Sequence, residues 1–284
     1  MRWQMGRRSD NIEDRRGMPV GRGAAVGGGI GTLLLVLLAL YFGVDPSVIL
    51  QGGDPTSTGP APRLQQRSAG DDQMRDFVSV ILADTEDTWR ELFERMGRQY
   101  QEPRLVLFSG AAQSACGFAE AAVGPFYCPG DKKVYIDLAF YRDLRDRLGA
   151  PGDFAQAYVI AHEIGHHVQN LLGIADRIRA AQGRRGQTDA NALQVRMELQ
   201  ADCFAGVWAN NAQRARQVLE AGDIEEGLNA ASAIGDDRLQ RQSQGRVVPE
   251  SFTHGSSAQR VRWFKRGIDS GDPGQCDTFA AARP

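Results

Sequence analysis

Three of the four histidines in this chain of 284 residues fall within six positions, in the segment DFAQAYVIAHEIGHHVQNLL. The triplet PGD at 151–153 is a helix start signal and Gly173 is a stop signal, so the pattern predicts a helix over residues 153–172. The apolar residues before the histidines indicate that this helix is buried. His162 and His166 then lie on one helix face, where two imidazoles can bind one metal ion.

The acidic residue between these two histidines completes a known pattern. Glu163 lies on the same helical turn and can reach a water molecule on the metal without being a ligand, as in the HExxH pattern of zinc-dependent peptidases. In the metzincin class the pattern continues with a glycine and a third histidine. Those two positions hold Gln169 and Leu172 here. The sequence therefore excludes that class, and the third ligand must come from another segment.

A second helix, predicted over residues 190–211, offers this third ligand. It contains MELQADCFAG, in which Glu198 is followed one turn later by Asp202. A catalytic zinc site has three protein ligands and one open position, so we expect Glu198 to be the third ligand. A carboxylate at Asp202 can accept the second N–H of a ligating histidine and fix its orientation. The alternative is a solvated helix face, but the apolar neighbours of both carboxylates argue against it.

The fourth histidine, His254, lies just before the last predicted helix, over residues 256–267. An imidazole here can stabilise the oxyanion that forms during peptide hydrolysis, and Arg260 can support the site from the same helix. The alternative is a surface histidine with a solvent-facing arginine. His167 points about 100° away from His166 around its helix, so we expect it to pack or to form hydrogen bonds rather than to bind metal.

The N-terminal part contains a long uncharged segment. No charge occurs between Arg22 and Asp45, and a helix over this stretch spans about 33 Å, enough to cross a bilayer. We therefore predict a transmembrane signal-anchor over residues 24–44 that contacts the lipid bilayer. A Pro/Gly/Ser-rich linker follows over residues 45–70. A cleaved signal peptide and a buried core helix are the alternatives.

The charge distribution gives this segment an orientation. Arginines precede it, so the positive-inside rule places a basic N-terminus, residues 1–23, in the cytoplasm and residues 71–284 outside, in the periplasm or extracellular space. The net charge of −2 divides into +3 for residues 1–70 and −5 for the remainder, which does not favour nucleic-acid binding. Hydrophobic residues make up 42% of the chain, which excludes a disordered or a polytopic membrane protein.

The chain has four cysteines and no CxxC motif. An exported domain lies in an oxidising compartment, where disulfides are expected. Cys116 and Cys128 lie close together across a hairpin-like loop, which favours their pairing and leaves Cys203 and Cys276 by elimination. Four reduced and buried thiols are the alternative, and the sequence alone does not determine the connectivity.

The remaining patterns predict an α+β fold that is mainly α, with a small sheet near the N-terminal side of the domain. Besides the helices above, we expect helices over 72–100 and 224–242, a strand at 105–108, two strands around turns between 114 and 140, and a loop over 174–190. A strand at 124–128 or 134–136 is a candidate to hold a substrate by strand addition. Tyr127 and Tyr135 are the expected lining of that cleft.

The combination of motifs resembles a known bacterial family, the neutral zinc metallopeptidases. The resemblance covers nearly the whole chain and rests on MRWQ…RRSDNIEDRRG, GPFYCP, VYIDLAF, HEIGHHVQNLLG, ELQADCFAGVWA and HGSSAQRVRWF. The family is similar to thermolysin-like gluzincins in the layout of its site. The resemblance implies one Zn²⁺ per chain, held by His162, His166 and Glu198, with Glu163 as the catalytic residue. His254 and Arg260 resemble the His…Arg element of membrane-associated gluzincin proteases.

Together these features predict a membrane-anchored endopeptidase that hydrolyses peptide bonds of a peptide or protein substrate. A metal-activated water attacks, and Glu163 is the general base. A peptidoglycan-directed zinc amidase or endopeptidase is an alternative, since the predicted compartment holds that polymer. A non-hydrolytic, zinc-stabilised envelope scaffold is another. The sequence carries no signal for an oligomeric state.

Overall fold

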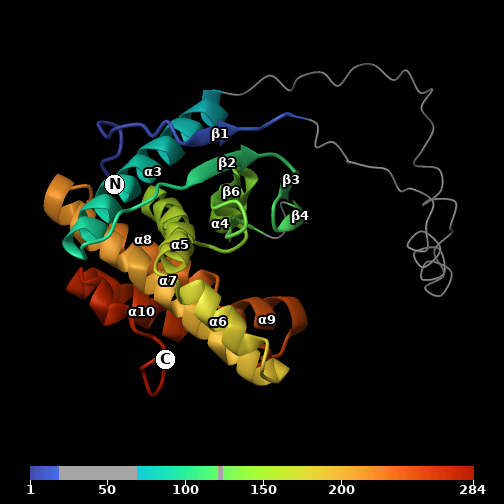
Figure 1. Ribbon diagram of the computed structural model, residues 1–284. Helices are drawn as coiled ribbons and strands as arrows, with labels where there is room; N and C mark the ends of the chain where they lie inside the picture. Colours follow the sequence, from blue (N-terminus) through green and yellow to red (C-terminus); the bar gives the residue numbers. More distant parts are fainter. Residues whose placement is uncertain (19–68, 121–123) are drawn as a thin grey trace, which may run out of the picture. The chain divides into compact units, whose positions relative to one another are not determined.

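The computed structural model describes residues 1–18, 69–120 and 124–284 (Figure 1). The fold is α+β and mainly helical, as the sequence predicts. Its helices are α3 (Ala69–Arg95), α4 (Ala139–Asp146), α5 (Asp153–Leu171), α6 (Ile174–Gln182), α7 (Gln187–Arg216), α8 (Asp223–Ala233), α9 (Asp236–Gln244) and α10 (Ser257–Ser270), with short 3-10 turns η3 (Pro249–Ser251) and η4 (Pro273–Cys276).

A four-stranded sheet has the order β1 (Ile12–Asp14), β2 (Arg104–Phe108), β6 (Lys133–Asp137) and β5 (Phe126–Cys128). The first three strands are parallel, and β5 pairs with β6 in the antiparallel sense. The last four residues of β2, LVLF, are all buried, because a parallel strand is covered on both faces. A separate hairpin consists of β3 (Ala111–Ser114) and β4 (Gly117–Glu120).

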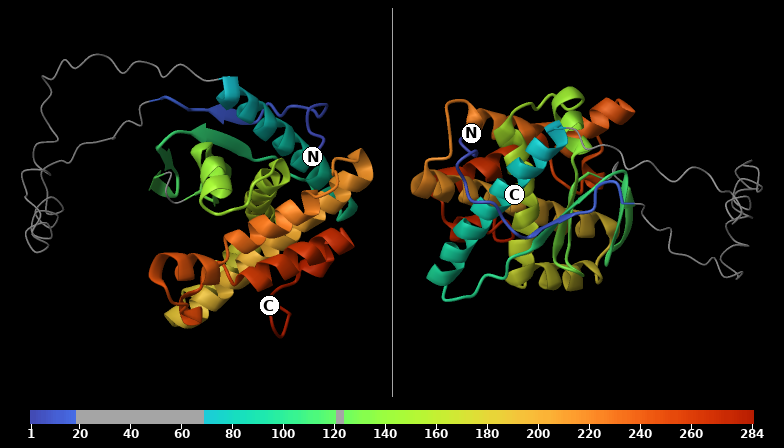
Figure 2. Two further views of the ribbon diagram at one scale, coloured as in Figure 1. Left: turned by 180° about the vertical axis from the view of Figure 1, so that it is seen from behind. Right: turned by 90° about the horizontal axis from the view of Figure 1, so that it is seen from above.

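Helix α5 is the centre of the molecule. It contacts α3 and the strands β5 and β6 on one side and α7 and α8 on the other. Its apolar residues from Phe154 to Val168 are buried on every face, which explains why the stretch before the histidines lacks a polar face. Figure 2 shows α7 and α10 side by side. A Cβ on Gly267 would lie 2.0 Å from the Cys203 carbonyl oxygen, so only glycine allows α10 to approach α7 this closely.

The N-terminal segment Met1–Met18 belongs to the same compact unit as residues 69–120 and 124–284. This division differs from the predicted one, which treats residues 1–23 as a separate basic head. Ile12 in β1 pairs in register with Leu105, and Trp3 packs edge-on against Phe77 with ring centroids 5.3 Å apart. The segment therefore contributes a strand and an aromatic side chain to the domain.

The arginines of this segment are paired within the domain. Arg7 lies 2.8 Å from Glu86 and Arg8 lies 2.6 Å from Asp76, both on α3. Their charges are thus neutralised by carboxylates of the fold. The predicted anchor over residues 24–44 lies outside the described residues. Within 1–18, 69–120 and 124–284, no helix combines the length and the apolar character needed to cross a bilayer.

Two further predictions differ from the structure. The segment 174–190 is not a loop, because α6 and the start of α7 occupy most of it and only the residues between these helices interrupt them. The helix predicted over 224–242 is two helices, α8 and α9, interrupted at Gly235. A Cβ at Gly235 would lie 2.4 Å from the Ser257 backbone nitrogen. The break therefore lets the start of α10 pack against this turn.

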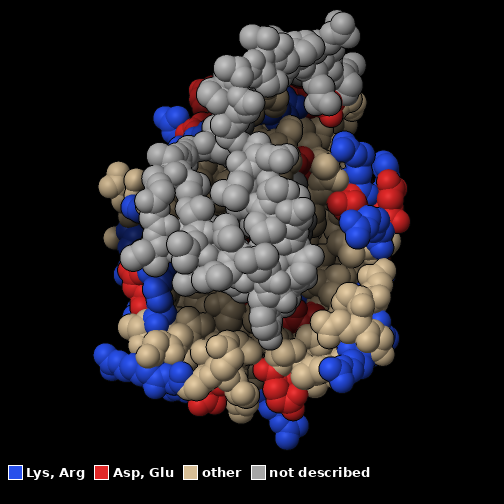
Figure 3. All heavy atoms as spheres, turned by 90° about the vertical axis from the view of Figure 1, so that its right-hand side faces the viewer, with Lys and Arg blue, Asp and Glu red and all other residues tan. Residues whose placement is uncertain are grey.

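Charged side chains of both signs lie on the face drawn in Figure 3. On the face drawn in Figure 3, the visible Lys and Arg side chains lie intermixed with Asp and Glu side chains. Among the described residues visible there, no continuous basic surface is presented to a phosphate backbone.

Candidate active site

The site forms where α5 crosses α7. A Cβ on Gly165 would lie 2.9 Å from the Ala201 carbonyl oxygen and 3.0 Å from its Cα. Glycine at this position therefore lets the two helix backbones approach closely. This approach places Glu198, one turn before Ala201, opposite the two histidines of HEIGH.

Three donor atoms converge at this crossing. Glu198 Oε2 lies 3.2 Å from His162 Nε2 and 3.3 Å from His166 Nε2, and the three side chains form a cluster suited to a metal ion. Ligand atoms of a tetrahedral Zn²⁺ lie about 3.4 Å from one another, given bonds of about 2.1 Å. The donor set and its spacing thus fit zinc.

A buried network of charges orients the first histidine. His162 Nδ1 lies 2.9 Å from Asp202 Oδ1. Arg260 donates to both carboxylate oxygens of Asp202, from Nε and from Nη2, at 2.9 Å each. The Tyr158 hydroxyl also donates to Asp202. Burial alone would raise the pKa of Asp202, but Arg260 and His162 lower it to about 2, so Asp202 is a carboxylate that accepts the N–H of His162.

The second histidine has a neutral partner. His166 Nδ1 lies 2.9 Å from the Gln169 side-chain oxygen. In both histidines the Nδ1 atom is therefore engaged, and Nε2 faces Glu198. Burial raises the pKa of Glu198, but the two imidazoles more than offset this, and the net pKa lies well below the usual value. Burial lowers the pKa of His166, but Glu198 more than offsets this and raises it to about 9. Zinc requires an ionised glutamate and imidazole lone pairs, so its binding would release the protons that these imidazoles share with Glu198.

A cavity of about 540 Å³ opens onto these three donor side chains, and Glu163 and His254 also line it. Glu163 is buried, with 7% of its surface exposed. Much of the remaining lining is apolar, including Pro125, Phe126, Phe140, Val159, Ile234 and Leu239. The cavity thus combines the donor cluster, one acidic side chain and an apolar wall.

His254 is held by a carboxylate that the sequence reasoning missed. Its Nδ1 lies 3.1 Å from Asp236 Oδ1, and Asp236 Oδ2 accepts the backbone N–H groups of Thr253, His254 and Gly255. The hydrogen bond to Asp236 raises the pKa of His254. Asp236 is the first residue of α9. The prediction of one continuous helix over 224–242 concealed that helix start.

The two candidate cleft tyrosines have different positions. Tyr127 lines the cavity, and its hydroxyl lies 3.0 Å from His167 Nδ1 and accepts from Asn170 at 3.1 Å. Tyr135 does not line it, which corrects the prediction. Its ring is buried and stacks on Phe126, with centroids 4.8 Å apart, because it faces the second apolar cluster on the other side of the sheet.

His167 has the hydrogen-bonding position expected from its angle on the helix. It is fully buried, and its Nε2 lies 2.6 Å from the Gln101 carbonyl oxygen. Burial lowers its pKa to about 4. His167 therefore stays neutral in the fold and connects α5 to the segment before β2.

Two disulfides join the four cysteines. Cys116 pairs with Cys128, and Cys203 pairs with Cys276, which confirms the pairing favoured by the sequence. The second bond attaches the segment after α10 to α7, directly beside Asp202.

A buried HExxH helix crossed by a second helix that bears a glutamate and a supporting aspartate defines the class of zinc metallopeptidases. The chain belongs to the family described as "Putative neutral zinc metallopeptidase", whose model matches residues 1–279. It is 56% identical to "Uncharacterized protein YpfJ" of Escherichia coli K12, over 98% of this chain and 99% of the relative. It is 45% identical to "Uncharacterized protein Rv2575" of Mycobacterium tuberculosis, over 86% of each chain. No solved structure matches the chain.

Proposed function

We propose that this protein is a zinc-dependent endopeptidase with a site arranged as in gluzincins. The observation that carries the proposal is the convergence of His162, His166 and Glu198 on one point, beside Glu163, in an open cavity. The chemistry that a bound Zn²⁺ supplies is polarisation of the scissile carbonyl and of a water molecule. The supports behind both imidazoles keep their Nε2 atoms facing Glu198 Oε2, so that these three side chains would hold the ion.

In this proposal, Glu163 moves the protons. Its carboxylate accepts a proton from the attacking water and transfers it to the amine that leaves. His254, oriented by Asp236, donates a hydrogen bond to the oxyanion that develops on the substrate carbonyl. The raised pKa of His254 favours its protonated form, which is the better donor to a negative oxygen.

The substrate is a peptide segment in an extended conformation. Strand β5 lies at an end of the strand order β1-β2-β6-β5, and Gly124, Phe126 and Tyr127 line the cavity from it and from the residue pair before it. An edge strand can pair with an extended peptide. The apolar wall of the cavity favours apolar side chains next to the scissile bond.

Replacement of Glu163 by Gln tests this mechanism. The amide keeps the size of the side chain but cannot accept the proton, so we expect the variant to retain zinc and to lose about 10²–10⁴-fold in kcat. Zinc content and turnover of casein and of muropeptides are measured for wild type and variant. Casein turnover supports the endopeptidase and muropeptide turnover supports the peptidoglycan alternative. A zinc-loaded wild type inactive on every peptide supports a scaffold, and an undiminished Glu163→Gln rate refutes the mechanism.

Attachment to a membrane through residues 24–44, and an envelope location of the domain, remain predictions. The attachment rests on the uncharged sequence of that segment. The predicted orientation, with residues 1–23 across the membrane from the domain, conflicts with the pairing of residues 1–18 with the domain. The two disulfides are consistent with an oxidising compartment.

A further inference from the structure

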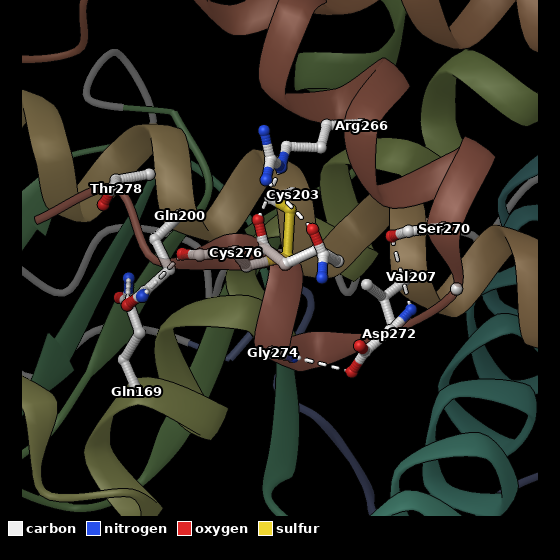
Figure 4. The surroundings of a disulfide bond; sticks show 12 residues. Gln169, Gln200, Cys203, Val207, Arg266, Ser270, Asp272, Gly274, Cys276 and Thr278 are labelled. Carbon is white, nitrogen blue, oxygen red and sulfur yellow. Dashed lines mark hydrogen bonds between the residues drawn. A yellow bond between two sulfur atoms is a disulfide. The ribbon is translucent and has the colours of Figure 1, made fainter. Parts of the chain in front are cut away.

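We propose that Gln169 is a positioning residue for His166 and that the Cys203–Cys276 disulfide holds it in place through Gln200. The inference rests on the proposed zinc site, although it does not depend on the reaction catalysed there. Figure 4 shows the residues around this disulfide, with Gln169, Gln200 and Cys276 in one row.

The first step is the orientation of the Gln169 amide. Gln169 is fully buried and lies one turn after His166 on α5. Its Nε2 donates to the Met197 carbonyl oxygen at 2.7 Å and to Gln200 Oε1 at 3.1 Å. A flipped amide would place an oxygen against these two acceptors, so the side-chain oxygen must face His166 Nδ1. This oxygen accepts a hydrogen bond from the Nδ1–H group, which favours the tautomer that leaves the Nε2 lone pair for the metal.

The second step is the orientation of Gln200. It is buried on α7, and its Oε1 is occupied by Gln169. Its Nε2 donates to the Cys276 carbonyl oxygen at 2.9 Å. The Cys276 carbonyl fixes the orientation of the Gln200 amide. In a flipped amide the Gln200 oxygen would face the Cys276 carbonyl oxygen, and the Gln200 NH₂ group would face the NH₂ group of Gln169. The position of the Cys276 carbonyl thus selects the orientation of both amides.

The third step is what fixes that carbonyl. Cys276 ends the short turn η4 and is bonded to Cys203, which lies one turn after Gln200 on α7. The Thr278 hydroxyl donates to the Arg196 carbonyl oxygen at 2.7 Å, and the Arg196 guanidinium donates to the Ala281 carbonyl oxygen at 2.9 Å. The C-terminal segment is therefore attached to α7 by one disulfide bond and by hydrogen bonds. These bonds hold the Cys276 carbonyl in the position that orients Gln200 and, through it, Gln169.

The test is zinc release from the full chain to a chromogenic chelator, measured for folded variants with matched melting curves. Gln169→Met and Gln200→Met replace each amide by an apolar side chain of similar length. Residues behind a metal ligand typically change metal affinity about 10–100-fold, so we expect release from Gln169→Met to be about tenfold faster. We expect smaller increases for Gln200→Met and for the double variant Cys203→Ala/Cys276→Ala.

The matched control is Cys116→Ala/Cys128→Ala, which removes the disulfide that does not contact this row of side chains. We expect it to release zinc at the wild-type rate. If Cys203→Ala/Cys276→Ala fails to fold, Gln200→Met tests the same connection with the disulfide intact. Wild-type release from Gln169→Met and Gln200→Met, or equal acceleration in the control, would refute the proposal. Loss of peptide hydrolysis with unchanged release refutes it too, without affecting the proposed function.

A second inference concerns the N-terminal segment. We infer that residues 1–18 and the domain occupy the same side of any membrane. Strand β1 pairs with β2 inside the sheet, Trp3 is buried, and Arg7 and Arg8 pair with carboxylates of α3. A single crossing by residues 24–44 would place these partners on opposite sides and remove all of these contacts.

Cysteine labelling of the full chain in bacterial cells tests this second inference. Met5 and Met96 have exposed side chains, one in each of the two segments, and the four native cysteines are paired. Met5→Cys and Met96→Cys are treated with a membrane-impermeant maleimide before and after lysis. We expect the two cysteines to react together or to be protected together. Reaction of one in intact cells and of the other only after lysis would show opposite sides and refute the inference.

Discussion

The two histidines proposed to bind zinc are held by supports of different kinds. His162 is oriented by Asp202, which is paired with Arg260 in a fully buried ionic network. His166 is oriented by Gln169 through neutral amide hydrogen bonds. Both supports depend on α7, which carries Asp202 and Gln200 as well as the proposed ligand Glu198. One helix therefore provides a ligand and the support for the two others.

The two supports should respond differently to the loss of a partner. A buried ion pair contributes little net stability, but removal of one partner leaves an uncompensated charge. A neutral hydrogen bond costs less to lose. We therefore expect changes near His162 to affect both the fold and the metal, and changes near His166 to affect mainly the metal.

The largest expected effect is that of Arg260→Met. The change leaves the Asp202 carboxylate buried without its guanidinium partner, so we expect the free energy of unfolding to fall by about 3–5 kcal/mol. Urea denaturation measures it. Arg262→Met is the control on the same helix, because Arg262 is exposed and surface changes are usually within about 0.5 kcal/mol. Equal free energies of unfolding for the two variants would contradict the view that the Asp202–Arg260 ion pair holds the support of His162 in place.

A smaller effect is expected from Asp202→Asn, which removes the charge but keeps the shape. His162 loses the ionised acceptor that fixes its Nδ1 proton, so we expect zinc affinity to fall about a hundredfold, more than for Gln169→Met. Competition with a chelator measures the affinity, and Asp269→Asn, an exposed carboxylate on α10, is the control. If Gln169→Met loses more zinc affinity than Asp202→Asn, the neutral amide behind His166 contributes more to zinc binding than the carboxylate behind His162, contrary to our expectation.

The smallest expected effect concerns His254. Like His162, it has a carboxylate partner, but its side chain is half-exposed to solvent. The hydrogen bond to Asp236 raises its pKa, so the protonated form persists to higher pH and activity should fall as pH rises through that raised pKa. Asp236→Asn removes the charge and lowers the pKa of His254. We expect the alkaline limb of the kcat/KM profile to move to lower pH, by about one unit or less. An unmoved limb would exclude His254 as the group that titrates.

Much of this site could be predicted from local sequence. HEIGH and ELQAD are helical patterns with fixed angular spacing, so the residues that share a face follow from the repeat of the α-helix. The same spacing predicted that His167 faces away from the other two histidines. Asp236 and Gln169 were missed as supports, because their partners depend on the turn at Gly235 and on the crossing of α5 with α7.

The contacts of the N-terminal segment and the orientation of Tyr135 could not be predicted from the sequence, for a second reason. The arginines near residue 7 indicate positive charge in the sequence, but only the fold shows that α3 carboxylates neutralise it. Tyr135 was assigned to the wrong side of its strand because side chains alternate between faces and the sequence does not say which face the site is on. Strand β1 has only three residues, too short for its periodicity to predict it.

The sequence by itself determined the donor residues, their helices, the mainly helical class and the favoured cysteine pairs, because these depend on spacing along one element or on short loops. Only the tertiary structure decided which elements meet. Gly165 and Gly267 let α5 and α10 approach α7, and these contacts assemble the ion pair behind His162 and the amide row behind His166. Such contacts join residues distant in the chain, and their geometry depends on the packing of whole helices rather than on any local pattern.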